Sequence, residues 1–325
     1  MTARKHGTRR PLRGKRPAAS PSNRSRRHTT DSGGDPRRGV IGLALSGGGA
    51  RGLAHIGVLK VLEREHIGVQ CLSGASMGGI IAAATATGIS ATQLEEVALE
   101  MSSLRRLVRL VDWHPPARGL LAGHKLRSFL ATLFPPDLTF NDLRVPLALE
   151  AVDLDTGEEV ALAEGSVLDA VMATAAFPGV LPPVGWQGRR LVDGGVLDNL
   201  PMDLLRSLGA DTVIAVNVGP MPGEADEAES SQVPGHWPTF IQTAIAAIAI
   251  MTRAQTRAKL QAEEPDLLIH PHLPTNVGTF SSFTRAREII EIGEQAAIDA
   301  MSAPGWRLLR ARIPSPAESA CQTMV

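Results

Sequence analysis

Residues 74–78 read Gly-Ala-Ser-Met-Gly and place a serine between an apolar run and an alanine-rich run. A serine on a tight turn from a strand into a helix exposes its hydroxyl, and the helix N-terminus beside it favours negative charge. We therefore predict that Ser76 is a nucleophile for acyl transfer and that the N–H of Met77 faces the developing oxyanion. Gly74 and Gly78 are predicted to keep the strand and the helix from clashing at this turn.

The segment SGGGARG at residues 46–52 marks a second turn from a strand-like run into a helical run. Glycines let the backbone approach a bound atom closely, and the N–H groups that open a helix favour an anion. The spacing Gly-x-Gly-x-x-Gly also matches a dinucleotide fingerprint, but the acidic residue expected about 20 positions later is missing. The other interpretation is an oxyanion hole, for which the candidates are Gly47, Gly48, Gly49, Ala50, Arg51 and Gly52.

The segment LVDGG at residues 191–195 offers a base for the serine. Asp193 ends an apolar run and is followed by Gly194 and Gly195, a pattern typical of a strand that ends in a tight turn. A carboxylate there could take the serine proton directly, and we then expect Asp193 to be partly desolvated so that its pKa suits a base. The simpler interpretation of Asp193 as a turn residue stays open.

Histidine is the alternative base. A Ser–His–Asp triad would need His236, His270 or His272, the histidines that follow Asp193 in the chain. The first lies in an acidic loop and the other two near a predicted strand, so none has a convincing setting. His55 lies among the apolar residues of a predicted helix, and we interpret it as a core or supporting residue.

The elements that must position these residues alternate between strand and helix. Residues 39–45 and 67–73 are short apolar runs, whereas residues 53–65 carry apolar side chains at helical spacing. Strand, helix, strand and helix in close succession predict a parallel sheet with right-handed crossovers. Later segments predict a β-hairpin over 146–165, a helix over 166–177, strands at 189–193, 211–219 and 265–273, and a closing helix over 283–301.

Two apolar segments could cover the site. Residues 101–134 are rich in Leu and Arg, and residues 240–251 read FIQTAIAAIAIM. Both could line an acyl groove or form a lid, and both could equally be ordinary core. The second segment is shorter than the roughly 18–20 apolar residues of a membrane span, so we predict a buried helix rather than an anchor.

The composition predicts a globular protein. Hydrophobic residues make up 43% of the 325, but only 3% are aromatic and none is tyrosine, so the core must consist of Ala, Val, Leu and Ile. Cys71 and Cys321 form neither a disulfide framework nor a zinc pattern, and we expect a reducing compartment.

Residues 1–39 carry 12 of the 33 Lys and Arg but only two acidic residues, although the net charge of the chain is zero. Such a polar segment cannot offset the entropy of ordering, so we predict disorder. A solvated tail is one interpretation, and a tail that binds anionic lipid or nucleic acid is the other.

Together the three glycine-marked segments resemble the bacterial patatin-like phospholipases, over nearly all of residues 40–300. LALSGGGARGLAHIGVLKVLE is similar to the glycine-rich oxyanion segment of that family. SGASMGGIIAA is similar to its nucleophile elbow, with Ala75 where Thr is commoner. ATAAFPGVLPPVGWQGRRLVDGGVLDNLP is similar to its segment ending in Asp-Gly-Gly or Asp-Gly-Ala, and all three occur in family order.

The resemblance implies a three-layer α/β/α fold with a mainly parallel central sheet. It implies a Ser76–Asp193 dyad that needs no histidine, and an oxyanion hole of backbone N–H groups around Gly48 and Gly49. Arg51 would hold the glycine loop, and a packing role without direct catalysis is equally compatible. An acyl-enzyme would cleave lipid esters, as a phospholipase, lysophospholipase or carboxylesterase, without a cofactor or a metal. A lipid-binding or regulatory protein without activity is the alternative, since a fold does not fix a function.

These expectations divide the chain into a basic tail (1–39), an acyl hydrolase domain (40–305) and a C-terminal tail (306–325). The predicted partner is a lipid ester, with transient contact to a membrane surface and no specific nucleic acid. We expect a cytoplasmic protein that works at the inner face of a membrane.

Overall fold

The structure is a computed structural model that describes residues 39–110, 112, 121–221, 239–303, 306, 309 and 310. The basic segment 1–38 and the acidic loop predicted over 223–238 lie outside these residues. Trp306 and Leu309 are buried against the main core, and most of the predicted C-terminal tail lies outside the described part of the chain. The predicted domain boundaries therefore stay predictions.

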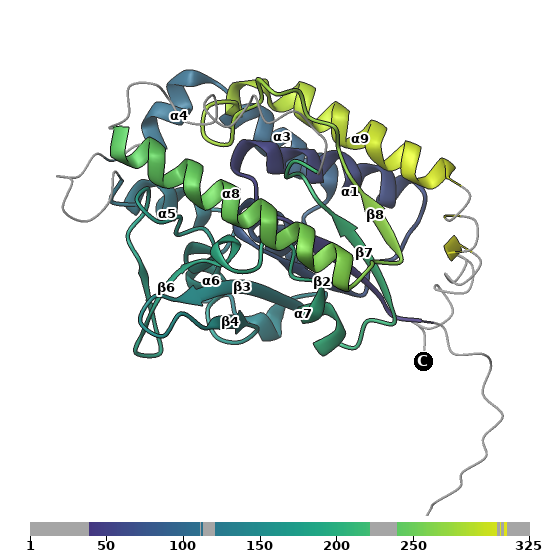
Figure 1. The fold of residues 1–325 in the computed structure, drawn as a ribbon, viewed down its shortest axis with the longest axis horizontal. Coiled ribbons are helices and arrows are strands. Elements are labelled where there is room, and N and C mark those ends of the chain that lie inside the picture. Colours follow the sequence, from purple (N-terminus) through teal and green to yellow (C-terminus); the bar gives the residue numbers. More distant parts are fainter. Residues whose placement is uncertain are drawn as a thin grey trace, which may run out of the picture. The chain divides into compact units, whose positions relative to one another are not determined.

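The described residues form one sheet with helices on both of its faces (Figure 1). The strands are β1 (Ile41–Leu45), β2 (Cys71–Gly74), β3 (Leu147–Asp153), β4 (Glu159–Leu162), β5 (Val184–Trp186), β6 (Arg189–Asp193), β7 (Thr212–Val216) and β8 (Leu267–Ile269). The α-helices are α1 (Ala54–Arg64), α2 (Ser76–Thr87), α3 (Ala91–Met101), α4 (Leu104–Leu110), α5 (His124–Leu130), α6 (Val167–Thr174), α7 (Met202–Ser207), α8 (Thr239–Ala262) and α9 (Ala286–Ser302). Short 3-10 helices are η1 (Gly49–Leu53), η2 (Phe140–Asp142), η3 (Gly194–Val196) and η5 (Phe283–Arg285).

The centre of the sheet is parallel and one side of it is antiparallel. The strand order is β5-β6-β3-β2-β1-β7-β8, and β4 pairs with β3 off this path. Strands β3, β2, β1, β7 and β8 run parallel, whereas β4 and β6 run antiparallel to β3, and β5 runs antiparallel to β6. The predicted α/β fold with a mainly parallel central sheet is confirmed, and the hairpin predicted over 146–165 is present as β3 and β4.

Alternation along the buried strands explains the helix layers on the two faces. In β1, Leu43 and Leu45 join the large core beneath α1, α2, α3 and α9, and Ala44 joins the smaller core beneath α7. Successive strand residues point to opposite faces, so a continuous apolar run is what a strand covered on both faces requires.

The closing helix α9 packs directly on α1 (Figure 1). A Cβ on Gly57 would lie 2.0 Å from the carbonyl oxygen of Ile290, and a Cβ on Gly293 would lie 2.0 Å from that of Ala54. The two helices therefore touch backbone to backbone, which fixes α1 and the glycine turn that precedes it.

The helix predicted over 240–251 is present as part of α8, but the prediction that it is buried is wrong. Ile241 and Ile245 are buried, whereas Phe240, Ile250 and Met251 are 69%, 49% and 51% exposed. This stretch is apolar on all sides, a pattern typical of a helix that is covered all round, yet only one of its faces meets the domain. Among the described residues, no helix is both long and apolar enough to cross a membrane.

Candidate active site

Ser76 lies at the point where β2 turns into α2. Ala75 is extended (φ −121°, ψ 145°), α2 begins at Ser76, and Ser76 itself has φ +53°. This left-handed conformation is uncommon for a residue with a Cβ, and such strain collects at functional sites. The strand–turn–helix context that the sequence predicts for Ser76 is present.

Two hydrogen bonds hold the backbone of this elbow. The Ser76 N–H donates to Oγ1 of Thr174 (3.0 Å), and the Thr174 hydroxyl donates to the carbonyl oxygen of Glu150 (2.6 Å). Thr174 is buried at the end of α6, 98 residues beyond Ser76. Because its N–H is already used, Ser76 presents only its hydroxyl to the site.

The two glycines that flank the elbow allow close backbone contact. A Cβ on Gly74 would lie 2.7 Å from the carbonyl carbon of Gly78, and a Cβ on Gly78 would lie 2.3 Å from the carbonyl oxygen of Leu45. Real Cβ atoms do not tolerate such distances, so both positions need glycine, as the sequence predicts for this turn.

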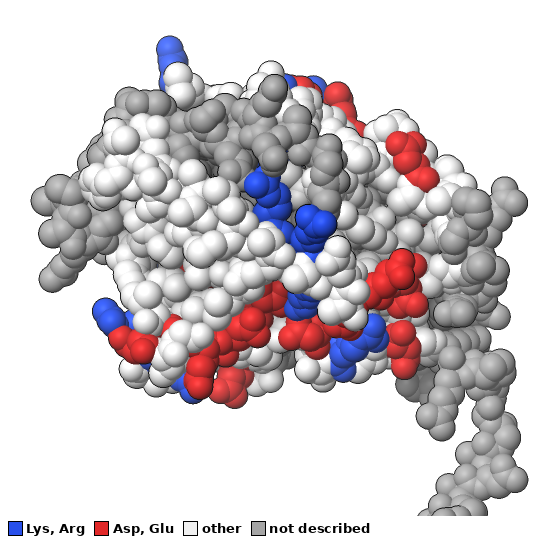
Figure 2. All heavy atoms as spheres, viewed as in Figure 1, with Lys and Arg blue, Asp and Glu red and all other residues white. Residues whose placement is uncertain are grey.

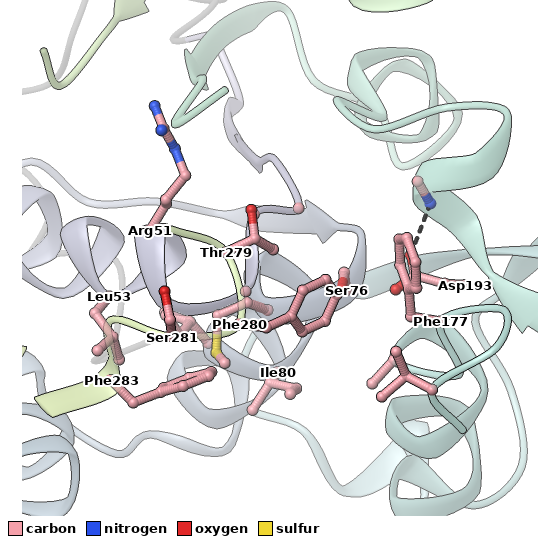
Figure 3. Close-up of a pocket in the computed structure, with 18 of the residues that line it drawn as sticks. Arg51, Leu53, Ser76, Ile80, Phe177, Asp193, Thr279, Phe280, Ser281 and Phe283 are labelled. Atoms are coloured by element: carbon pink, nitrogen blue, oxygen red, sulfur yellow. Dashed lines mark hydrogen bonds between the residues drawn. The ribbon is translucent and has the colours of Figure 1, made fainter. Parts of the chain in front are cut away.

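Asp193 ends β6 and is only 1% exposed. Its Oδ1 accepts the N–H of Gly195 (2.8 Å; Figure 3), and its Oδ2 has no hydrogen-bond partner among the described residues. Burial raises the pKa of Asp193 to about 6, while the nearby Ser76 hydroxyl and the Gly195 N–H lower it. The predicted desolvation of Asp193 is confirmed, and the carboxylate lies close enough to Ser76 for that hydroxyl to affect its pKa.

Three amides of the glycine turn are occupied by the protein itself. The N–H of Gly47 donates to the carbonyl of Asn199 (3.0 Å), and the N–H of Ala50 donates to the carbonyl of Thr279 (2.8 Å). The N–H of Arg51 closes the turn on the carbonyl of Gly48 (3.1 Å). These three amides of the candidate oxyanion segment are therefore not free to bind a ligand.

The amides of Gly48 and Gly49 are different. Neither donates to any acceptor in the described part of the chain, and neither does the amide of Met77 at the start of α2. Gly49 has φ +53°, and a Cβ there would lie 2.3 Å from the carbonyl oxygen of Thr279. Unpaired N–H groups at helix starts favour a negative charge, so the amides of Gly48, Gly49 and Met77 are the candidates for an oxyanion hole.

Arg51 points away from Ser76 (Figure 3). The side chain is 5% exposed, and its Nε donates to the carbonyl of Val218 (2.8 Å) and its Nη1 to that of Val277 (3.4 Å). Arg51 thus fastens the glycine turn to the segment after β7 and to the loop before η5, which favours the packing role over a direct one.

Among the described residues, the histidines lie outside the lining of the cavity beside Ser76. His55 is fully buried, and its Nε2 donates to the carbonyl of Ser46 (2.8 Å), which supports the start of the glycine turn. Burial lowers the pKa of His55 to about 4, so its ring is neutral near pH 7. His270 bonds the carbonyl of Asn217, its ring contacts that of His272, and no histidine of the described ranges lines the cavity beside Ser76. His236 lies outside these ranges.

The candidate residues open into a cavity of about 620 Å³. Ser76, Asp193, Gly48 and Gly49 line it together with Gly47, Arg51, Met77 and Gly195, whereas Ala50, Gly52, Gly74, Gly78 and Gly194 lie behind its wall. Figure 3 shows Phe177 and Phe280 beside Ser76 and Asp193, and their rings meet edge to face at 5.4 Å.

Most of the cavity wall is aliphatic. Segments 101–134 and 240–251 both contribute to it, so they line the cavity in addition to packing on the domain. Side chains from α1, α2, α3, α5, α8 and the loop after α6 include Ile56, Ile80, Ile81, Leu94, Leu126, Leu130, Leu181, Ile245 and Ile248. Such a lining suits a long apolar group next to a small polar centre.

Sequence reasoning missed two residues that hold the centre together. Thr174 fixes the Ser76 amide, and Asn199 donates from Nδ2 to the carbonyl of Gly47 (3.3 Å) while its own carbonyl accepts the Gly47 N–H. Thr174 is a polar residue in the apolar segment MATAAF, and that contrast is a signal in the sequence, whereas Asn199 follows Asp198 in VLDNLP and carries no such contrast.

The fold and the site define a class: an α/β protein in which a serine elbow and a glycine turn follow two adjacent parallel strands. The family model described as patatin-like phospholipase matches residues 43–206. The chain belongs to this family.

The relatives are longer than this chain. An uncharacterized NTE family protein of Mycobacterium tuberculosis is 36% identical over 200 residues, which cover 61% of this chain and 54% of the relative. Lysophospholipase nte1 of Aspergillus fumigatus is 30% identical over 205 residues, which cover 62% of this chain and 13% of that protein. The human patatin-like phospholipase domain-containing protein 6 is 36% identical over 184 residues, which cover 55% of this chain and 13% of that protein. The chain thus matches about half of the mycobacterial protein's length.

Among solved structures, VipD from Legionella pneumophila is similar in fold, with a TM-score of 0.54 and 15% sequence identity. The match covers 82% of this chain and 67% of VipD. At this identity the likeness concerns the fold alone.

Proposed function

We propose that the protein is a lipid acyl hydrolase that uses Ser76 as nucleophile and Asp193 as base. The observation that carries the proposal is the free carboxylate oxygen. Oδ2 of Asp193 is buried without a partner, and both Asp193 and Ser76 line one cavity. An unpaired buried carboxylate oxygen is costly, and a role in proton transfer to and from the serine explains why it is kept.

In the proposed reaction, Asp193 takes the Ser76 proton as Oγ attacks the ester carbonyl carbon. The amides of Gly48, Gly49 and Met77 stabilise the negative charge on the former carbonyl oxygen. The tetrahedral intermediate collapses, the C–O bond to the alcohol breaks, and the leaving alkoxide takes the proton from Asp193. A water then loses a proton to Asp193 and attacks the acyl-enzyme, which releases the fatty acid and returns the proton to Ser76. We expect the Ser76 hydroxyl to donate to the Asp193 carboxylate in the substrate complex, because catalytic hydrogen bonds are often long in unliganded enzymes and tighten on binding.

The proposed substrate is a lipid ester, since the cavity next to Ser76 is lined mainly by aliphatic side chains. The names of the relatives, phospholipase and lysophospholipase, support this substrate class. The mechanism uses side chains and amides of the chain alone and assigns no step to a cofactor. We propose that the enzyme acts from the cytoplasm in transient contact with a membrane surface.

A fluorophosphonate probe with a fluorescent tag tests the proposal, because it phosphonylates only an activated serine. The native protein should be labelled, whereas Ser76→Ala should remain unlabelled. The native protein that has not been treated with the probe should also hydrolyse p-nitrophenyl esters, with kcat/KM rising from acetyl to longer acyl chains. A folded protein that neither reacts with the probe nor hydrolyses any ester of the series would be a lipid-binding member of the family without activity.

A further inference from the structure

The outer face of α8 is an apolar stripe that nothing in the described chain covers. Phe240, Ile250 and Met251 are among the most exposed large apolar residues of the structure, and Ala244 and Ala247 between them are exposed as well. These positions recur at three- and four-residue spacing, so they form one continuous face. Exposed apolar patches of this kind mark interaction sites.

Helix α4 carries two further exposed apolar residues at the same cavity. Leu104 and Val108 are 69% and 60% exposed, and both also line the cavity. The inner face of α8 lines the same cavity with Ile245 and Ile248. We call the outer stripe of α8 together with these two α4 residues the mouth surface, because both helices also contribute residues to the cavity wall.

The charges on these helices are of one sign. Thr239–Ala262 and Leu104–Leu110 contain no Asp or Glu, while their exposed residues include Arg105 and Arg257. Figure 2 shows acidic side chains gathered on the part of the molecule that carries β4, β6 and α7, and a largely uncharged area over the first half of α8. The mouth surface is thus an apolar area flanked by cations, which is the pattern of a helix that lies in an anionic lipid interface.

The second half of α8 is hydrogen-bonded to the turn that follows Asp193. Oγ1 of Thr252 donates to the carbonyl of Gly195 (2.9 Å), and Lys259 forms ion pairs with Asp198 and Asp203. Gly195 also donates its N–H to Asp193. The stripe therefore ends, at Ile250 and Met251, beside Thr252, which contacts the turn that follows Asp193.

We propose that the mouth surface docks on an anionic lipid bilayer, with α8 lying in the plane of the interface, so that an acyl chain passes from the bilayer into the cavity without crossing water. This inference rests on the proposed function. A protein partner or a second copy on the same surface would cover the cavity that the substrate must enter, and the charge pattern complements an anionic lipid surface.

The test measures binding to vesicles of equal parts phosphatidylcholine and phosphatidylglycerol by sedimentation. All proteins carry Ser76→Ala, so that the vesicles are not hydrolysed. The triple variant Phe240→Ser, Ile250→Ser, Met251→Ser removes the stripe, and none of these residues lines the cavity. We expect its partition into vesicles to fall at least tenfold, since burial of even one large apolar side chain contributes about that factor.

A matched control separates position from hydrophobicity. Leu154→Ser, Ile298→Ser removes apolar side chains that are 47% and 37% exposed elsewhere on the domain, and it should bind vesicles like the reference protein. Circular dichroism should give the same melting temperature for all three proteins, because the changed residues are at the surface. The double variant Arg105→Gln, Arg257→Gln should bind these vesicles more weakly, by about fivefold for each arginine removed. Its binding to vesicles without phosphatidylglycerol should equal that of the reference protein.

Equal vesicle binding by the triple variant and the reference protein would overturn the proposal. If the chain is a dimer in light scattering and the triple variant is a monomer with unchanged vesicle binding, the surface is an interface between copies instead. The proposed function is checked separately, with a short soluble ester and intact Ser76: the triple variant should hydrolyse it within twofold of the native rate. Vesicle binding that depends on the stripe, without any esterase activity, would refute the proposed function and support the docking surface. Esterase activity without vesicle binding would support the proposed function and refute the docking surface.

Discussion

Ser76 follows β2 and Asp193 ends β6, and these two strands lie on either side of β3 in the strand order. β3 pairs with both, matching Leu149 to Gly74 near the elbow and Ala151 to Asp193. The two candidate catalytic residues therefore lie on either side of one strand. Their distance is set by the sheet and not by a flexible loop, as a preorganised site requires.

Removal of either side chain should abolish ester hydrolysis. Ser76→Ala eliminates the nucleophile, and Asp193→Asn keeps the shape of the side chain but cannot accept the proton, so we expect kcat to fall at least about 10³-fold in each. Asp137→Asn changes an exposed aspartate in the same way and should leave kcat unchanged. Initial rates with a p-nitrophenyl ester, together with circular dichroism spectra to show that the fold is intact, decide the matter. An active Asp193→Asn enzyme would exclude Asp193 as the base.

The glycine turn should be intolerant of a single methyl group. In Gly49→Ala the new Cβ would collide with the carbonyl oxygen of Thr279, which is 2.3 Å away, and the residue would keep φ +53°. The turn must shift, and loss of one oxyanion donor typically costs about 10²–10³ in kcat. Gly157→Ala is the control, because it also has positive φ (+72°) but its Cβ would meet nothing within 4 Å. Native kcat in a folded Gly49→Ala protein would show that this amide does not serve the reaction.

The sequence predicts the parallel centre and the elbow well because those features are local. A short apolar run, a glycine turn and a helical pattern occupy adjacent residues at Ser76, so no distant contact is needed to recognise them. Asn199 and Thr174 act on residues that are 152 and 98 positions away, and no local pattern encodes such a pairing. The exposed face of α8 could not be predicted for a related reason. The sequence shows that this helix is apolar, but it does not show whether the rest of the domain, a partner or a lipid surface covers each of its faces.

The rate should depend on the protonation of Asp193. The base works only when ionised, and burial raises its pKa to about 6, so kcat/KM for a soluble ester should rise with pH through about 6 and level off above pH 7. His55 does not contribute to this rise, because burial lowers its pKa to about 4. A pH–rate profile between pH 4.5 and 8, read with a pH-independent fluorogenic ester, measures the midpoint. A profile that is flat over this range would mean that Asp193 is not the titrating base.

The stability of the fold should depend on pH through Glu150, which lies in β3 next to the turn that follows Asp193. It is 2% exposed, and its Oε1 has no partner among the described residues. Burial, followed by the negative charges of Asp198, Glu159 and Asp203, raises the pKa of Glu150 to about 9, although Lys259 opposes the shift. At neutral pH the native protein therefore holds a proton on Glu150 that the unfolded chain has lost.

This difference in bound protons determines whether stability rises or falls with pH. Between pH 4.5 and about 9 the native state holds a proton on Glu150 that the unfolded state lacks, so the contribution of Glu150 to the free energy of unfolding falls by about 1.4 kcal/mol per pH unit. Glu150→Gln keeps the shape and stays neutral, and it should raise the melting temperature at pH 8 while changing it little at pH 5. Glu158→Gln, at an exposed position of the β3–β4 hairpin, should change neither value. A Glu150→Gln protein that melts lower than the native protein at pH 8 would instead mean that Glu150 is ionised in the fold and stabilised by Lys259.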